Sequence, residues 1–285
     1  MLETITAKDP SIRVDVLLIF LVVLDHVTEN DQLLDVANEG LRLTKQTGNE
    51  NVYGYFLGKK SLFLLSKLSS MVHREKNLKL SANVFKWIDF SLERDKKEYE
   101  AIIEERKELE EEADKAMIEV EERANGSNDY YFRGHMYSEV AEFHCSKCLL
   151  YKLDFQRGGR RRSMIANIYF VRRWNLDKFL YDRKSRKKIE SSERECYEYF
   201  NKAIEEFRLG GKKSEEAHAI YNLAVKFKIF YRFRKASLFL AKARVIAEEL
   251  QEKYLLEKIK VLEKETADKN RHLRDWATEL GLDMP

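Results

Sequence analysis

A chain of 285 residues is long enough to bury a substantial hydrophobic core, as one elongated domain or as two. With only 2 prolines and 11 glycines beside 35% charged residues, the composition excludes β-rich and loop-rich folds and favours long helices with solvated faces. The net charge of +3 alone implies no partner. Three cysteines do not make a disulfide framework, so we expect a reducing, cytoplasmic location.

The first predicted helix, residues 11–27, contains the apolar run Val16–Leu24. These nine residues are about half of the ~20 that a membrane span requires, so we expect a buried helix and no membrane partner. The sequence that follows, DHVTENDQ, offers no small-residue cleavage site, which argues against a signal peptide. Two more helices are predicted at residues 30–48 and 52–72 from apolar residues at helical spacing.

A very long helix is predicted over residues 80–124. Most of its apolar residues recur at alternating steps of three and four, which is typical of a coiled-coil seam with one charged interruption. The seam consists of Tyr99, Ile102, Arg106, Leu109, Ala113, Ala116 and Val120. About 45 residues at about 1.5 Å each would make a rod of roughly 68 Å. Its partner is left open: other helices of the same chain, or a second copy in a homodimer.

The turn sequence Asn125–Asn128 ends this helix and divides the chain into residues 1–125 and residues 126–285. The second region starts with a helix near Tyr130, which Gly158–Gly159 is expected to break. Further helices are predicted near residues 163–180, 191–209, 214–231, 234–250 and 253–269, with a short capping helix at 271–280.

The most specific spacing in the chain lies between residues 220 and 243. Small and apolar residues recur there at fixed intervals: Ile220, Leu223, Ala224 and Phe227, then Ala236, Leu240 and Ala243. This spacing resembles the tetratricopeptide repeat, in which two antiparallel helices lock through small residues at their crossing. The match covers about residues 216–250, while Cys196, Phe200 and Ala203 fit the second helix of a preceding unit. The resemblance implies an all-α solenoid of stacked antiparallel helix pairs, here with one long central helix.

Positive charge gathers in the basic segment, residues 152–188, which holds 13 basic and three acidic residues. Its candidate binding residues are Arg157, Arg160, Arg161, Arg162, Arg172, Arg173, Arg183, Lys184, Arg186, Lys187 and Lys188. Interleaved aromatic residues make nucleic-acid binding a hypothesis, because cations neutralise phosphates and aromatic rings stack on unpaired bases. Residues 93–122 carry 14 acidic and six basic residues, so the alternatives are an acidic protein partner, pairing with this segment, or a solvated surface.

The sequence offers little support for catalysis or cofactors. His144, Cys145 and Cys148 form the nearest approach to a metal site, but a structural zinc site needs four ligands and commonly two such pairs. Phosphate-binding glycine loops, a Gly-x-Ser-x-Gly elbow and an HExxH pair do not occur. We therefore expect no enzyme activity, no metal and no cofactor.

The leading functional hypothesis is a non-enzymatic scaffold for protein–protein interactions. In the family that the chain resembles, the first helix of each pair lines the partner groove, which implicates Asn222 and Lys226 beside the packing residues. The partner would be a protein or peptide. Two alternatives stay open: a nucleic-acid-binding protein that uses the basic segment, and a sensor or assembly module of a larger protein.

Overall fold

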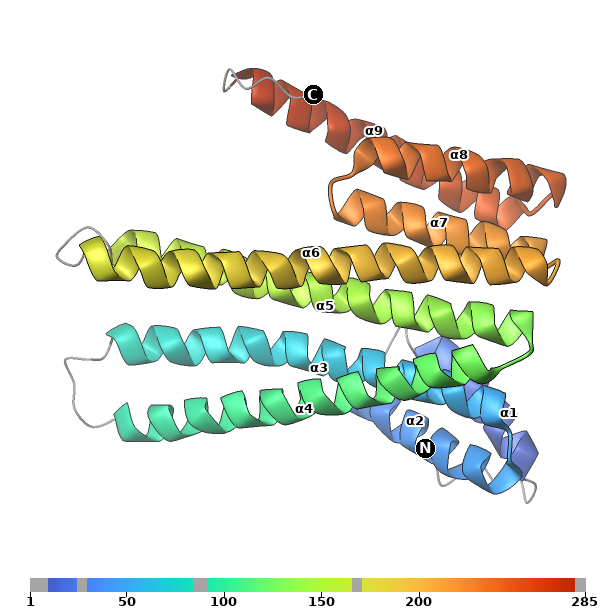
Figure 1. Ribbon diagram of the computed structural model, residues 1–285, viewed down its shortest axis with the longest axis horizontal. Coiled ribbons are helices and arrows are strands. Elements are labelled where there is room, and N and C mark those ends of the chain that lie inside the picture. Colours follow the sequence, from blue (N-terminus) through green and yellow to red (C-terminus); the bar gives the residue numbers. More distant parts are fainter. Residues whose placement is uncertain (1–9, 25–29, 85–91, 166–170, 280–285) are drawn as a thin grey trace. The chain divides into compact units, whose positions relative to one another are not determined.

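The computed structural model describes residues 10–24, 30–84, 92–165 and 171–279, which are helical apart from short turns (Figure 1). The side chains of residues 153–182 and of Lys184 are among those that lie outside the description. The helices of the described part are α1 (Pro10–Leu24), α2 (Asn30–Thr47), α3 (Glu50–Val84), α4 (Leu92–Gly126), α5 (Tyr130–Ile165), α6 (Val171–Leu209), α7 (Lys213–Ile229), α8 (Phe233–Glu249) and α9 (Lys253–Glu279). The predicted all-α class is thus confirmed.

The packing divides the chain into two units that are discontinuous in sequence. Unit 1 comprises Met1–Gly126 and Glu139–Cys196, and unit 2 comprises Ser127–Ser138 and Tyr197–Pro285. Helices α5 and α6 therefore contribute to both units. The division of the chain into residues 1–125 and residues 126–285 stays a prediction.

The core at the beginning of unit 1 joins α1, α2 and α3. Buried residues of the three helices form one cluster: Val14, Leu17, Leu33, Val36, Ala37, Leu43, Phe56 and Phe63. Gly40 lies directly under Phe56, since a Cβ atom at residue 40 would come within 2.3 Å of the ring. Of the apolar run in α1, Leu17 is buried in this core and Ile19 is 64% exposed, while the side chains of residues 20–24 lie outside the description. Among the described residues, no helix is long and apolar enough to cross a membrane.

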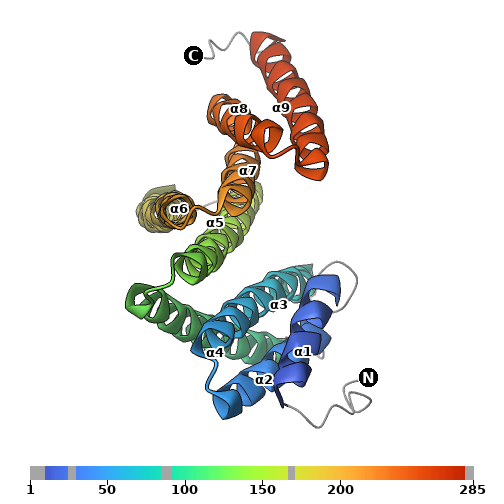
Figure 2. The ribbon, with the colours of Figure 1, turned by 90° about the vertical axis from the view of Figure 1, so that its right-hand side faces the viewer.

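The prediction of one helix over residues 80–124 is wrong. Residues up to Val84 belong to α3, and α4 begins only at Leu92 and packs beside α3 (Figures 1 and 2). The seam itself is confirmed, because Ile102, Ala113 and Val120 are buried. Each of these helices has 35 residues, so α4 can bury its stripe against a partner of equal length in its own chain. The seam of unit 1 is therefore occupied without a second copy.

Three predicted interruptions are also wrong. Helix α5 continues through Gly158–Gly159 to Ile165, α6 is continuous from Val171 to Leu209, and α9 includes the predicted capping helix. A glycine costs an exposed helix only about 1 kcal/mol, which neighbouring good helix formers can offset. Residues 181–190, between two of the predicted helices, are highly charged but contain no proline or glycine. Their charge alone does not end α6.

Unit 2 consists of the first residues of α5, the last residues of α6, and α7 to α9. All seven positions of the repeat-like spacing between Ile220 and Ala243 are buried, as are Phe200 and Ala203. The same turn recurs at residues 211, 231 and 251, which all have positive φ angles. Each is followed by a residue whose N–H binds the carbonyl five residues earlier, at 2.7–2.9 Å. The tetratricopeptide resemblance stays a prediction, but its packing positions do face the core of this unit.

Close approach of α5 and α6 in unit 2 yields a first prediction. A Cβ atom at Gly134 would come within 2.5 Å of the ring of Phe207, which is buried. We expect Gly134→Ala to lower the free energy of unfolding by about 1–3 kcal/mol through overpacking, although alanine favours a helix by about 1 kcal/mol. The measurement is urea denaturation followed by circular dichroism.

The matched control is Gly126→Ala, because no atom lies within 4 Å of a Cβ atom at that position. It should change the free energy of unfolding by no more than about 0.5 kcal/mol. Equal stability of the Gly134→Ala variant and the wild type would contradict the close packing of these two helices.

Candidate functional site

Helix α7 separates a buried stripe from an exposed polar face. Ile220, Leu223 and Phe227 are buried, while Asn222 is exposed and Lys226 is half-buried one turn further on. Glu215 and Glu216 lie in the first turn and Lys226 and Lys228 in the last, an order that the helix dipole stabilises. The structure therefore brings the two predicted groove residues together on one side of α7.

Helix α9 extends this surface. Its buried stripe is Leu255, Ile259, Leu262 and Thr266, which leaves Tyr254 67% and Val261 56% exposed. Polar contacts join α7 to α9 and to Glu252, the residue before it: Nε2 of His218 lies 2.7 Å from Oε1 of Glu252, and Lys228 forms an ion pair with Glu265. We call the surface formed by Asn222, Lys226, Ile229, Tyr254, Lys258 and Val261 the α7/α9 face.

Sequence reasoning misses the residues that α9 contributes to this face. Tyr254, Lys258, Val261 and Glu265 lie at steps of four, three and four, which is the spacing of one helix face. The signal is present, but a surface stripe becomes recognisable only once the buried stripe of the same helix is known. Nζ of Lys258 lies over the Tyr254 ring, 4.3 Å from its centre, and forms a cation–π contact with it.

A cavity of about 470 Å³ opens at the start of α5 in unit 2. Its lining residues are Asn128, Asp129, Tyr130, Tyr131, Gly210 and Lys212. Burial raises the pKa of Tyr131, with a further contribution from the negative charge of Glu215 in the first turn of α7. Nζ of Lys212 lies 5.5 Å from the centre of the Tyr131 ring. The cavity therefore offers an aromatic wall near the N-terminus of α7.

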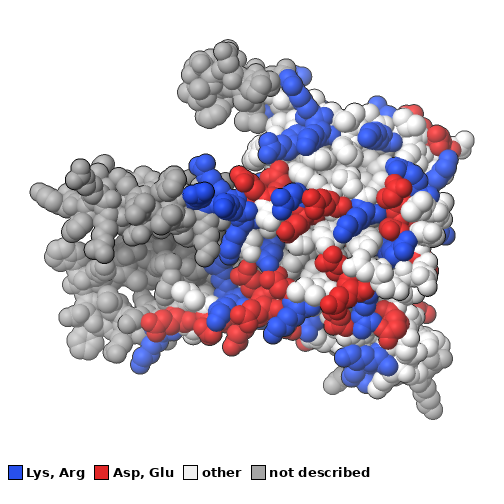
Figure 3. Space-filling view, viewed as in Figure 1, with Lys and Arg blue, Asp and Glu red and all other residues white. Residues whose placement is uncertain are grey.

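Only part of the basic segment falls within the described side chains. Arg183, Arg186, Lys187 and Lys188 are exposed on α6. The side chains of Arg157, Arg160, Arg161, Arg162, Arg172, Arg173 and Lys184 lie outside the described residues. Two carboxylates of the acidic helix α4 pair outside the basic segment: Lys147 binds Asp114 at 2.5 Å and Lys60 binds Glu112 at 2.7 Å. Figure 3 shows acidic and basic side chains interspersed over the described part of the face in view.

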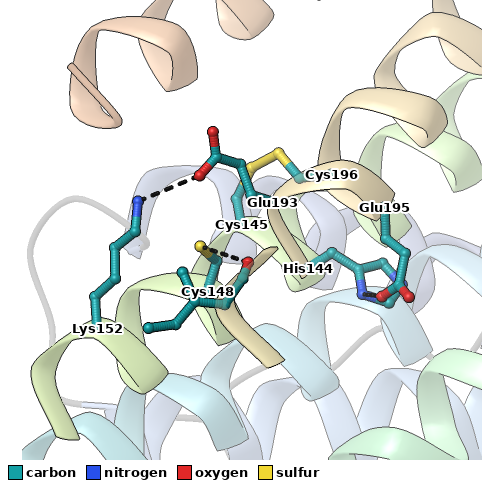
Figure 4. The surroundings of a disulfide bond; sticks show 8 residues. His144, Cys145, Cys148, Lys152, Glu193, Glu195 and Cys196 are labelled. Carbon is teal, nitrogen blue, oxygen red and sulfur yellow. Dashed lines mark hydrogen bonds and ion pairs between the residues drawn. A yellow bond between two sulfur atoms is a disulfide. The ribbon is translucent and has the colours of Figure 1, made fainter. Parts of the chain in front are cut away.

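The three cysteines make no disulfide framework, but two of them are paired: Cys145 of α5 is bonded to Cys196 of α6 within unit 1 (Figure 4). Their Cα atoms are 5.2 Å apart, although 51 residues separate them along the chain. Closing a loop of this length stabilises a fold by about 4 kcal/mol in the chain-entropy account. The bond also removes the cysteine argument for a reducing compartment, so the cytoplasmic location stays a prediction.

The remaining residues of the suspected metal motif are engaged in helix pairing. Sγ of Cys148 lies 3.6 Å from the carbonyl oxygen of Ile189, and burial raises the pKa of this thiol to about 11. Nδ1 of His144 lies 2.9 Å from Oε2 of Glu195, and Lys152 pairs with Glu193 on the same stretch of α6 (Figure 4). Among the described side chains, no group of three or more possible ligands is arranged to hold a metal ion.

Comparisons with known proteins do not assign the chain to a family. It matches no model of a known protein family, and no curated protein matches it either.

The state of the cysteines can be tested by counting thiols. In denaturant without reductant, we expect one thiol per chain to react with Ellman's reagent, and three after reduction, because Cys145 and Cys196 are bonded. In the folded protein near pH 8, Cys148 should react slowly, since it is buried and its pKa is about 11. Three reactive thiols in the denatured, unreduced chain would contradict the disulfide, and fast labelling of the folded protein would contradict the burial of Cys148.

His144 makes the stability of unit 1 depend on pH. Burial lowers its pKa below 6.5 and outweighs the attraction of Glu195, while nearby Lys147 lowers the pKa further and Glu121 and Asp114 raise it. The unfolded chain therefore binds this proton more readily than the folded chain. The stabilising effect of a neutral His144 is present above about pH 6.5 and is lost as the pH falls below that value.

We expect His144→Gln to reduce the loss of stability between pH 7.5 and pH 5.5, since glutamine does not titrate. Urea denaturation of both proteins across that range of pH measures the difference. If the free energy of unfolding falls equally in both, His144 is not the group responsible.

Proposed function

We propose that the chain is a non-enzymatic scaffold of the tetratricopeptide-like type, which holds a protein or peptide segment on the α7/α9 face. One observation carries the proposal: this face leaves large apolar side chains in solvent although the helices beneath are well packed. Ile229, Tyr254 and Val261 are 39%, 67% and 56% exposed. Aromatic residues in particular are enriched where proteins bind one another.

The chemistry of the face indicates the kind of segment that it would hold. Apolar side chains of the partner would cover Tyr254 and Val261, while Lys226 and Lys258 add positive charge beside them. A segment with two or three apolar residues flanked by carboxylates complements both features. Asn222, exposed in the middle of α7, can donate to and accept from the partner's backbone.

Two of the groups with shifted pKa values, Cys148 and Tyr151, lie in the packed interior of unit 1. Burial raises the pKa of both Cys148 and Tyr151, and Tyr151 donates a hydrogen bond to Glu110 at 3.0 Å. Both residues are engaged with neighbouring helices of unit 1.

The nucleic-acid alternative and the module alternative stay hypotheses. The described part of the basic segment shows four exposed cations on α6, which suit phosphates and carboxylates equally well.

Selection of random 12-residue peptides displayed on phage tests the scaffold proposal. Selected peptides should contain apolar residues next to Asp or Glu. We expect Tyr254→Ala to weaken binding about tenfold or more, because an exposed aromatic anchor is lost. Fluorescence polarisation with a labelled peptide measures the dissociation constant.

The matched control is Ile118→Ala, which removes a large apolar side chain, 57% exposed, from α4 in unit 1. It should leave the dissociation constant unchanged within about twofold. Peptides that bind both variants as tightly as the wild type would place the binding surface elsewhere, and a selection that yields no binder would overturn the proposal.

A further inference from the structure

Helix α8 exposes an apolar stripe on the side that faces away from its neighbours. Its buried residues, Phe233, Ala236, Leu240, Ala243 and Ala247, account for its packing in unit 2, chiefly against α7 and α9. On another side, Leu238 and Val245 are each 56% exposed, and Ala241 between them is also exposed. We call Leu238, Ala241 and Val245 the outer stripe. They lie three and four residues apart, which is the spacing of a helix that packs on a further helix.

The charges at the two ends of α8 oppose its own dipole. Arg234 and Lys235 lie in the first turn, and Glu248 and Glu249 lie in the last turn. The N-terminus of a helix favours negative charge and the C-terminus favours positive charge, each by about 0.3–1 kcal/mol. Helix α7, the preceding helix of unit 2, follows that preference. The reversed order on α8 is therefore unfavourable for the isolated helix.

We propose that the outer stripe of α8 is a self-association surface, on which α8 of a second copy of this chain packs in antiparallel orientation. The reversed charges supply the argument, because an antiparallel copy places the basic end of one helix beside the acidic end of the other. The two helix dipoles are then antiparallel, which is also an attractive arrangement. This inference is independent of the proposed peptide binding, which uses the α7/α9 face.

The register of such a pair follows from the sequence. Arg234 and Glu248 each lie seven residues from Ala241, so a two-fold axis at Ala241 sets Arg234 opposite Glu248 of the second copy at both ends of the pair. Leu238 and Val245, three and four residues from the axis, then lie side by side across the pair, and the small side chain of Ala241 permits close approach at the centre. One surface is thus complementary to itself, as an isologous dimer requires.

Some of these charges already have contacts within the chain. Lys213 binds Glu249 at 3.1 Å, and Nζ of Lys235 lies 5.5 Å from the centre of the Phe227 ring. Arg234 and Glu248 are both exposed, 14 residues apart on the same side of the helix. These two residues therefore carry the electrostatic complementarity. A face of one 17-residue helix is small for an interface, so we expect a reversible dimer with a dissociation constant in the micromolar range.

Sedimentation velocity of the full chain from about 1 to 200 μM tests the proposal, a range chosen to bracket a micromolar dissociation constant. We expect a monomer–dimer equilibrium in the wild type. Arg234→Glu and Glu248→Arg should each weaken the dimer about tenfold or more, since each sets like charges against each other at both ends of the pair. Both substitutions also restore the charge order that the helix dipole favours, so the variants should keep their helical content and thermal stability.

The deciding sample is an equimolar mixture of the two variants. In a mixed pair, the two substituted positions meet at one end, where the introduced glutamate faces the introduced arginine. The unchanged Arg234 and Glu248 meet at the other end, so dimers should return. Lys260→Glu, a charge reversal at an exposed position of α9, is the matched control and should leave the equilibrium unchanged. The proposal is overturned if the wild type is a monomer at all concentrations, if a dimer persists equally in the single variants, or if the mixture stays monomeric.

Discussion

Close packing of helices across small residues is the constraint on which both units depend. Gly40 lies under the ring of Phe56 in unit 1, and Gly134 lies under the ring of Phe207 in unit 2. In both places the absence of a Cβ atom lets an aromatic ring fill the space between two helices. Both rings are buried, so a Cβ atom at either glycine would have to displace a ring within a densely packed interior.

The same constraint explains why alanine dominates the contact of α7 with α8. Ala224, Ala236 and Ala243 are all fully buried at positions where larger side chains would separate the helices. Larger apolar residues, such as Leu223 and Leu240, then fill the space on either side. This alternation of small and large residues is what the sequence spacing reports, so the helix pair could be predicted from the spacing alone. The spacing could not reveal how many further helices would pack upon the pair.

Periodicity predicts that a stripe is buried, but it does not name the partner. The seam from Ile102 to Val120 is a packing surface, as its spacing predicts, yet its partner is α3 of the same chain. The reversal between Val84 and Leu92 escapes prediction because no proline or glycine marks it. The pairing of Cys145 with Cys196 escapes prediction for a related reason, since it depends on the register between α5 and α6. The candidate site divides in the same way: Asn222 follows from the repeat-like spacing, whereas Tyr254 requires the orientation of α9.

Two groups of exposed apolar residues in unit 2, those of the α7/α9 face and those of the outer stripe, lie on surfaces that do not overlap. One lies on α7 and α9. The acidic first turn and basic last turn of α7 interact favourably with its helix dipole. The other lies on α8, where the charge order is unfavourable until a second helix neutralises it. An antiparallel pair formed through α8 leaves the α7/α9 face of each copy open, so a dimer would present two such faces. Two linked faces raise the effective concentration of a divalent partner, and a weak peptide contact at each face would then suffice for stable attachment. Charges that are unfavourable within the isolated helix can thus increase the avidity of the assembled scaffold.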